Sequence, residues 1–422
     1  MALGQLPTRR RVLTSFATLL SGMGLARLLT AISLILVARQ VGPSSYGQYV
    51  ACFSLAKLTS VAFSWGLDGW LLWRGGSATD RRMIAVQSGA ALTWKLILGG
   101  IWFVSLYLLA GWLNPKVFPL SVLLISGLIV WVDDLTSTVW SAFKSTLQND
   151  VTFKIITSVQ LLMVLATAAL ILADTQTLIT FLWARLIIAA IGCIAAVYLL
   201  RHNIGIGFIP STMLPIFRGA MPFAASLVFS LIYERADVTI IGQFLGTEQA
   251  GLYGPAATLV TTLFLIPASA YAVMVPVFTR AHAIQAAQFA TTLRLFLAVN
   301  TALGICLAAG LAFSAGWIMQ QLYGDQYAES GAVLAILSLV LGLRCVTFAL
   351  GAAVVGAGLQ TRRLKAQALA AALNVVINLI IVGAWGIRGV AWVYVFTEFV
   401  LLIGYWLALA PMRLRGAPKT VR

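Results

Sequence analysis

The stretch Val41–Tyr49, VGPSSYGQY, returns in the second half of the chain as Leu245–Tyr253, LGTEQAGLY. Both copies read aliphatic-Gly-x4-Gly-x-Tyr, and each lies in a polar gap between two long apolar stretches. An echo at half the length of a 422-residue chain indicates that one half is a copy of the other. In a membrane protein, paired halves are typical of a transporter whose site lies where the halves meet.

The composition of the chain indicates that lipid is its solvent. The chain is 61% hydrophobic and 9% charged, whereas a soluble domain has about 25% charged residues. Apolar stretches of about 20 residues then cross the bilayer as helices, because lipid leaves the backbone to satisfy its own hydrogen bonds. The sequence predicts twelve such spans, near residues 12–38, 47–73, 83–110, 117–143, 153–173, 177–200, 216–242, 252–278, 292–316, 330–356, 365–383 and 387–410.

The net charge of +16 is explained by the position of the loops, without a nucleic-acid partner. If the amino terminus is cytoplasmic, most of the 28 Lys and Arg residues fall in cytoplasmic loops. The loop cations on the other side are Arg39, Lys116 and Arg388. This asymmetry follows the positive-inside rule and predicts that both termini are cytoplasmic.

The echo divides the chain into two predicted lobes of six helices, residues 1–205 and 206–422. Because each lobe has six spans, equivalent helices cross the membrane in the same direction, as in parallel repeats. No predicted loop is long enough for an external domain, which disfavours a membrane glycosyltransferase or polymerase. The sequence also lacks a phosphate loop and a metal cluster. We therefore expect a transporter rather than an enzyme, with no resident cofactor.

Cations inside the predicted spans are the main candidates for a binding site. A charge near the bilayer centre costs roughly 2.5–3.5 kcal/mol on insertion scales, so it faces a cavity or a partner. The cations near the middle of their spans are Arg27, Lys57, Lys95 and Arg344. No acid lies within one turn of them on the same helix, so they predict a passage for an anionic head group such as phosphate. The alternative is ion pairing between helices, which we favour for Asp68 and Arg185 because these lie nearer the interfaces.

A second group of polar residues predicts either cation or proton binding, or hydrogen bonds between helices. Glu234 and Asp237 share one helix face at i, i+3, and Asn374 and Asn378 share another at i, i+4. Thr397 lies in the last span. Spacing alone favours helix packing for this group.

Several segments resemble polysaccharide-biosynthesis flippases, the Wzx-like members of the multidrug/oligosaccharidyl-lipid/polysaccharide exporter superfamily. The segments that carry the resemblance are 38–49, 63–68, 222–223, 235–237, 245–246, 374–378 and 386–392. The resemblance implies two six-helix lobes arranged as a V around a central cavity. It also implies movement of undecaprenyl-diphosphate-linked oligosaccharide across the bacterial inner membrane for O-antigen, exopolysaccharide or capsule synthesis. A polysaccharide polymerase and assembly proteins are then expected partners.

The resemblance also implies roles for individual residues. In the related lipid II flippases, arginines on the cavity helices bind the diphosphate; Arg27 resembles one of them and Lys57 is a looser match. Those flippases can also bind sodium, through a set that Asp237, Asn374, Asn378 and Thr397 resemble. This chain departs from that pattern at Asn378, where the related proteins have an acid.

We therefore predict a flippase that works by alternating access and holds the diphosphate with Arg27 and Lys57. Arg344 and Lys95 are further candidates for substrate binding, and Asp237, Glu234, Asn374, Asn378 and Thr397 for coupling to sodium or protons. The nearest alternative is a multidrug/cation antiporter of the same superfamily, which the mid-membrane cations disfavour. A membrane glycosyltransferase or polymerase and a scaffold of an assembly complex are the others.

Overall fold

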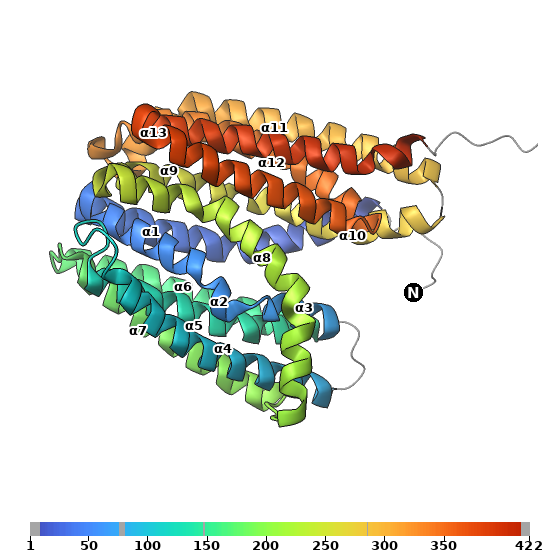
Figure 1. Ribbon diagram of the computed structural model, residues 1–422, viewed down its shortest axis with the longest axis horizontal. Coiled ribbons are helices and arrows are strands. Elements are labelled where there is room, and N and C mark those ends of the chain that lie inside the picture. The colour runs from blue at the N-terminus through green and yellow to red at the C-terminus, as the bar shows by residue number, and fades with distance from the viewer. Residues whose placement is uncertain (1–8, 76–80, 147, 285, 415–422) are drawn as a thin grey trace, which may run out of the picture. The chain divides into compact units, whose positions relative to one another are not determined.

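The computed structural model describes residues 9–75, 81–146, 148–284 and 286–414, and the regular secondary structure of these residues is helical throughout (Figure 1). This confirms the predicted all-α fold. The helices are α1 (Arg9–Thr59), α2 (Val61–Ser64), α3 (Leu67–Gly75), α4 (Arg81–Ala110), α5 (Leu120–Ser145), α6 (Asn149–Leu172), α7 (Leu178–Asn203), α8 (Pro210–Leu245), α9 (Thr247–Leu263), α10 (Leu265–Ile284), α11 (Ala286–Tyr323), α12 (Ser330–Gly356) and α13 (Gln360–Leu414), with one 3-10 turn, η1 (Asp325–Tyr327).

Two of the long helices, α1 and α13, pass through a non-helical glycine. Gly42 has φ 77° and ψ 168°, and Gly386 has φ 57° and ψ −157°. Both lie where the sequence predicts a gap between spans, and glycine adopts positive φ without steric cost. Ten segments of the described residues are long and apolar enough to cross a membrane, and two of them contain these glycines. The exact count of twelve spans stays a prediction.

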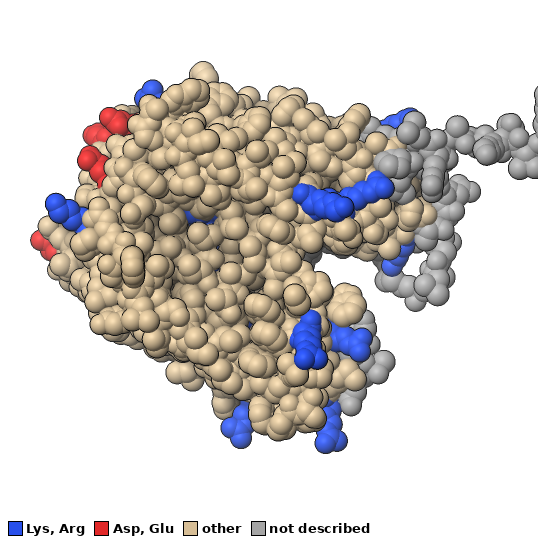
Figure 2. All heavy atoms as spheres, viewed as in Figure 1, with Lys and Arg blue, Asp and Glu red and all other residues tan. Residues whose placement is uncertain are grey.

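The surface of the helices is largely apolar. Large hydrophobic side chains such as Leu165, Ile194 and Phe313 are exposed along α6, α7 and α11. Figure 2 shows that most charged side chains on this face stand near helix ends, with a broad uncharged surface between them. Water would penalise that surface, whereas bilayer lipid accommodates it. The chain is therefore a multi-pass membrane protein.

The described residues group into two compact units. The first unit is Leu28–Gly254, and the second combines Met1–Arg27 with Pro255–Arg422. The division falls inside α1 and inside α9, so each of these helices contributes to both units. The boundary between residues 205 and 206 that the sequence echo predicts stays a prediction.

The second predicted span, residues 47–73, is broken among α1, α2 and α3 because of its packing against α8. At Gly66, where φ is 64°, a Cβ atom would overlap the backbone nitrogen of Ala224 on α8. The neighbouring Trp65 donates its indole N–H to the Phe217 carbonyl at 3.2 Å and stacks on the Phe217 ring, with centroids 4.7 Å apart. This close approach of two backbones requires a glycine and interrupts the helix.

The eighth predicted span, residues 252–278, is divided between α9 and α10 at Phe264. Pro267 follows three residues later, and its ring nitrogen cannot donate to the carbonyl of Leu263. The helix breaks here because the proline removes one backbone hydrogen bond.

The two copies of the sequence echo contact each other in the first unit, where α1 and α9 lie side by side (Figure 1). A Cβ atom on Gly47 would overlap the carbonyl oxygen of Thr247, and a Cβ atom on Gly251 would overlap that of Pro43. The contact is reciprocal, because Gly47 corresponds to Gly251 in the echo and Pro43 to Thr247. The second glycine of each copy, Gly47 or Gly251, is therefore required for packing against the other copy.

We expect Gly47→Ala and Gly251→Ala to destabilise the protein by similar amounts, roughly 1–3 kcal/mol each, because each methyl group forces two backbones apart. The measurement is thermal unfolding of the purified protein in detergent. Gly100→Ala on α4 is the matched control: no atom lies within 4 Å of the added methyl group, and a helical Gly→Ala change is neutral or stabilising. Equal unfolding temperatures for all three variants would contradict the packing requirement.

Candidate functional site

Lys95 lies at the centre of a buried charge network in the first unit. Its Nζ atom lies 2.7 Å from Asp68 Oδ1 and 2.6 Å from Asp134 Oδ2, and it donates to the Asp134 carbonyl oxygen at 3.0 Å. Asp68 also accepts hydrogen bonds from Ser137 and Thr138. The ammonium group thus makes two hydrogen bonds, to Asp68 Oδ1 and to the Asp134 carbonyl oxygen, and an ion pair with Asp134 Oδ2. The side chain is also completely buried, so the geometry favours a structural role for Lys95 over substrate binding.

Lys57 lies at the edge of the same network and keeps an accessible charge. Its Nζ atom is 4.0 Å from Asp134 Oδ1, an oxygen that also accepts a hydrogen bond from Ser64 at 2.8 Å. The Lys57 side chain is 31% exposed, while Asp134 is 7% exposed. Lys57 is thus a member of the network that can also meet a ligand.

Arg27 lies on the part of α1 that belongs to the second unit, and its side chain is exposed. Arg344, in the same unit, is buried instead. Its Nε atom lies 3.3 Å from Glu398 Oε2, and its Nη2 donates to the Tyr394 hydroxyl at 3.2 Å. The guanidinium also stands 4.7 Å from the centre of the Phe264 ring. Glu398 and Tyr394 are on α13 and Phe264 lies between α9 and α10, so Arg344 on α12 joins these segments and has little surface left for a substrate.

Asn374, Asn378 and Thr397 form a buried hydrogen-bonded set in α13. Asn378 Nδ2 donates to Asn374 Oδ1 at 3.3 Å, and Asn374 Nδ2 donates to Thr397 Oγ1 at 3.4 Å. Thr397 in turn donates to the Val393 carbonyl at 2.9 Å. Within the described part of the chain, Asn378 Oδ1 is the oxygen of this set that lacks a hydrogen-bond partner. Three neutral side chains with one open oxygen fit helix packing better than a sodium site, which favours several oxygen ligands and negative charge.

The two acids predicted alongside this set lie in the first unit. Asp237 is 2% exposed, and its Oδ2 accepts a hydrogen bond from the Tyr253 hydroxyl at 2.6 Å while its Oδ1 accepts one from the Val238 N–H at 2.8 Å. Glu234, one turn earlier, is exposed. No cluster of three or more His, Cys, Asp or Glu able to hold a metal occurs among the residues that the structure describes. Coupling to sodium or protons therefore stays a prediction.

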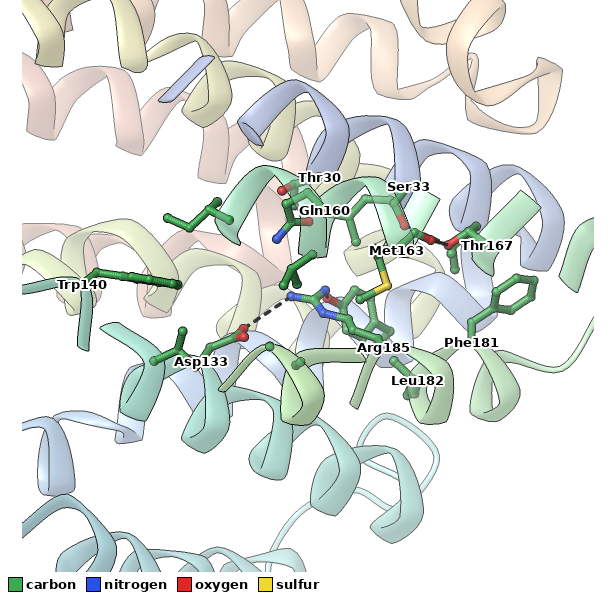
Figure 3. A pocket seen from close by; sticks show the side chains of 18 residues that line it. Thr30, Ser33, Asp133, Trp140, Gln160, Met163, Thr167, Phe181, Leu182 and Arg185 are labelled. Carbon is green, nitrogen blue, oxygen red and sulfur yellow. Dashed lines mark hydrogen bonds and ion pairs between the residues drawn. The ribbon is translucent and has the colours of Figure 1, made fainter. Parts of the chain in front are cut away.

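A cavity of about 290 Å3 lies among α1, α5, α6 and α7 of the first unit (Figure 3). Its polar lining includes Thr30, Asp133, Thr136, Trp140, Gln160 and Arg185. Figure 3 shows Asp133 and Arg185 pointing toward each other. Arg185 Nη2 lies 3.8 Å from Asp133 Oδ2, and the two side chains are 19% and 47% exposed. The cavity thus contains an ion pair that retains open surface.

Arg185 makes the interhelical ion pair that the sequence favours for it, and aromatic neighbours also hold it in this cavity. Its Nη1 donates to the Tyr49 hydroxyl, and the guanidinium carbon lies 5.0 Å from the centre of the Phe53 ring. Cation–π contacts of this kind stabilise a guanidinium away from water. Tyr49, the last residue of the first echo copy, therefore positions a charge in the cavity.

Comparison with known proteins identifies the family. A family model described as "Polysaccharide biosynthesis protein" matches residues 36–332. The chain belongs to this family. The resemblance seen in the sequence is thereby confirmed, although no curated protein sequence matches the chain.

Solved structures show the fold of this polysaccharide biosynthesis protein. An inward-facing multidrug resistance MATE family transporter of the MOP superfamily is similar with TM-score 0.77 and 14% identity, covering 93% of this chain and 96% of the other. The lipid II flippase MurJ in an inward closed conformation gives TM-score 0.76 and 12% identity over 93% of this chain and 87% of its own. A MOP superfamily transporter from Pyrococcus furiosus gives TM-score 0.66 and 13% identity, covering 98% and 97%. The fold is that of the MOP superfamily, whose members here are transporters rather than enzymes.

The charged residues of this site can be identified from the sequence, but the residues with which they form ion pairs cannot. Lys95 and Arg344 show no acid nearby on their own helices, whereas the structure supplies Asp68, Asp134 and Glu398 from other helices. Periodicity compares residues of one helix only, so it cannot reveal these pairs. The polar cavity is missed for the same reason, since four separate helices line it.

Removing the buried ammonium group is expected to destabilise this polysaccharide biosynthesis protein. Lys95→Met removes the main counter-charge of Asp134, which is buried, and of Asp68, whose side chain is 25% exposed. We expect a cost of about 3–5 kcal/mol, as for a broken buried pair. Thermal unfolding and the yield of monodisperse protein in detergent measure this loss. Lys57→Met is the matched control, because the Lys57 side chain is 31% exposed and its Nζ atom lies 4.0 Å from Asp134, so this pair contributes at most about 1 kcal/mol. A Lys95→Met protein as stable as Lys57→Met would show that the network is not structural.

Proposed function

We propose that the protein is a flippase that moves an undecaprenyl-diphosphate-linked oligosaccharide from the cytoplasmic to the outer leaflet of the bacterial inner membrane. The observation that supports this most is membership of the polysaccharide biosynthesis family over residues 36–332. The likeness of the fold to lipid II flippase MurJ supports the same reading, because that protein is named for a lipid-linked saccharide. The exported saccharide then serves O-antigen, exopolysaccharide or capsule synthesis, with a polymerase and assembly proteins as partners.

The accessible cations are the residues that suit the diphosphate. The Arg27 side chain is exposed and the Lys57 side chain is 31% exposed, whereas Lys95 and Arg344 are enclosed by partners. A diphosphate presents several acceptor oxygens, which a guanidinium binds in pairs and an ammonium binds as a point charge. In this proposal Arg27 and Lys57 hold the head group, while Lys95 and Arg344 keep the helices in place.

In a mechanism of alternating access, these cations compensate the charge of the diphosphate during its passage. A diphosphate cannot cross about 30 Å of hydrocarbon without compensation of its charge, whereas the polyprenyl tail remains in lipid throughout. A cationic site that opens first to one leaflet and then to the other supplies that compensation. Both termini lie in the cytoplasm in this proposal, as the loop charges predict.

The double variant Arg27→Ala/Lys57→Ala tests the proposal. We expect its outer-leaflet lipid-linked saccharide to fall at least about tenfold at equal protein level, because two charge-assisted hydrogen-bond donors of about 1.5–3 kcal/mol each are lost. Surface labelling of the lipid-linked sugar in cells that otherwise lack the gene is the measurement. The control is Lys154→Ala/Arg201→Ala, which removes two exposed cations from α6 and α7. Undiminished outer-leaflet product in the first variant would reject the cationic site.

A multidrug antiporter is the second candidate, since the MATE transporter matches this fold as well as the flippase does. Accessible cations disfavour cationic drugs by direct repulsion. Unchanged drug sensitivity on overexpression, together with lost polysaccharide in a deletion strain, would separate the flippase from the antiporter.

We also propose that sodium does not drive transport. The neutral set Asn374, Asn378 and Thr397 is satisfied mainly by its own hydrogen bonds, and the Asp237 carboxylate accepts hydrogen bonds from Tyr253 and the Val238 N–H. Replacing sodium by choline at fixed pH and membrane potential should therefore leave the rate of translocation in proteoliposomes unchanged, within about twofold. A loss proportional to sodium concentration would restore the sodium site that the resemblance implies.

A further inference from the structure

We propose that the cavity among α1, α5, α6 and α7 is a subsite for one neutral sugar unit of the lipid-linked saccharide; this rests on the proposed function. The flippase proposal assigns the diphosphate to Arg27 and Lys57 but leaves the saccharide without a binding surface. The cavity has several polar side chains in its lining, among them Asp133, Gln160 and Arg185. Its charge, hydrogen-bonding groups and size each select the same class of ligand.

The charge of the cavity disfavours an ion. Asp133 and Arg185 are the charged residues among the described side chains that line it, and they carry opposite signs. A cation bound at Asp133 would lie near the guanidinium, since the two groups are 3.8 Å apart. Like charges at about 4 Å repel by roughly 4 kcal/mol at an effective dielectric constant of 20. An anion bound at Arg185 meets the same penalty from Asp133, so a neutral ligand is favoured.

A hydroxyl group matches this ion pair in both directions. At 3.8 Å the two charged groups are farther apart than a direct hydrogen bond, and an oxygen atom can lie about 2.8 Å from both. Such a hydroxyl donates to the Asp133 carboxylate and accepts from Arg185. Gln160 and Thr30, which also line the cavity, add an amide and a further hydroxyl. Sugars present several hydroxyl groups on one ring and can use all of these at once.

The shape of the cavity also suits a sugar. Its volume of about 290 Å3 is the space of roughly ten water molecules at ~30 Å3 each, comparable with one pyranose ring and its hydroxyl groups. Figure 3 places the Trp140 ring at one end of the cavity, where its apolar face can pack on the C–H face of a sugar. A second hollow, of about 580 Å3 among α11, α12 and α13, is lined mainly by apolar residues such as Phe396 and Phe399 and suits a hydrocarbon chain instead.

The test compares two lipids on the purified protein in nanodiscs: the lipid-linked saccharide extracted from cells that lack this gene, and undecaprenyl diphosphate without sugar. We expect the unaltered protein to bind the saccharide-bearing lipid at least about tenfold more tightly, because a few net hydrogen bonds of about 0.5–1.5 kcal/mol each are added. In Asp133→Asn/Gln160→Leu that preference should fall to about twofold or less, while the affinity for undecaprenyl diphosphate stays the same. The control Asp174→Asn changes an exposed acid between α6 and α7 and should keep the full preference.

The outcomes separate the subsite from the proposed function. If the unaltered protein shows no preference for the saccharide-bearing lipid, or if the double variant keeps it, the subsite is overturned while translocation can still occur. If the double variant loses affinity for both lipids equally, the cavity acts on the fold and the subsite is also overturned. If the unaltered protein neither binds nor translocates either lipid, the proposed function fails and the subsite fails with it.

Discussion

One ammonium group, that of Lys95, joins α3, α4 and α5 of the first unit. In lipid there is no water to solvate a charge, so the ammonium and its two carboxylates must satisfy one another. Asp68 stands on α3 and Asp134 on α5, so the position of α3 follows from this contact. Lys57 lies at the edge of the same network, with its Nζ atom 4.0 Å from Asp134. The network around Lys95 therefore connects three helices and extends to a partly exposed cation on α1.

The membrane cations of this protein divide by what surrounds them. Lys95 and Arg344 are buried among their partners, whereas Arg27 is exposed and the Lys57 side chain is 31% exposed. Arg185 lies between these classes, since aromatic rings and Tyr49 hold it while one side faces a cavity. The residue type and the depth of each cation in the membrane do not distinguish these classes. Partners from other helices decide whether a buried charge stabilises the fold or remains available to a ligand.

The helical fold can be predicted from the sequence because lipid permits few other structures. Each apolar stretch is also recognisable from its own residues, without knowledge of distant ones. The charged and polar candidates can also be read from the sequence, since such residues are rare within spans. The break near Gly66 cannot be predicted in this way, because its cause is Ala224, far along the chain. The ion pairs and the cavity likewise depend on contacts between helices, which one sequence without an alignment does not encode in any local pattern.

The reciprocal contact of Gly47 with Thr247 and of Gly251 with Pro43 bears on how the protein arose. Two identical subunits related by a twofold axis make reciprocal contacts of this kind. If residue i of one subunit contacts residue j of the other, then residue j of the first also contacts residue i of the second. A chain that carried one copy of the echo would therefore make this contact with a second copy of itself. Gene fusion would then have kept an existing homodimer interface and freed the two halves to acquire different charges. The tyrosine that ends each copy now contacts a charge of opposite sign. Tyr49 accepts a hydrogen bond from the cation Arg185, and Tyr253 donates one to the acid Asp237.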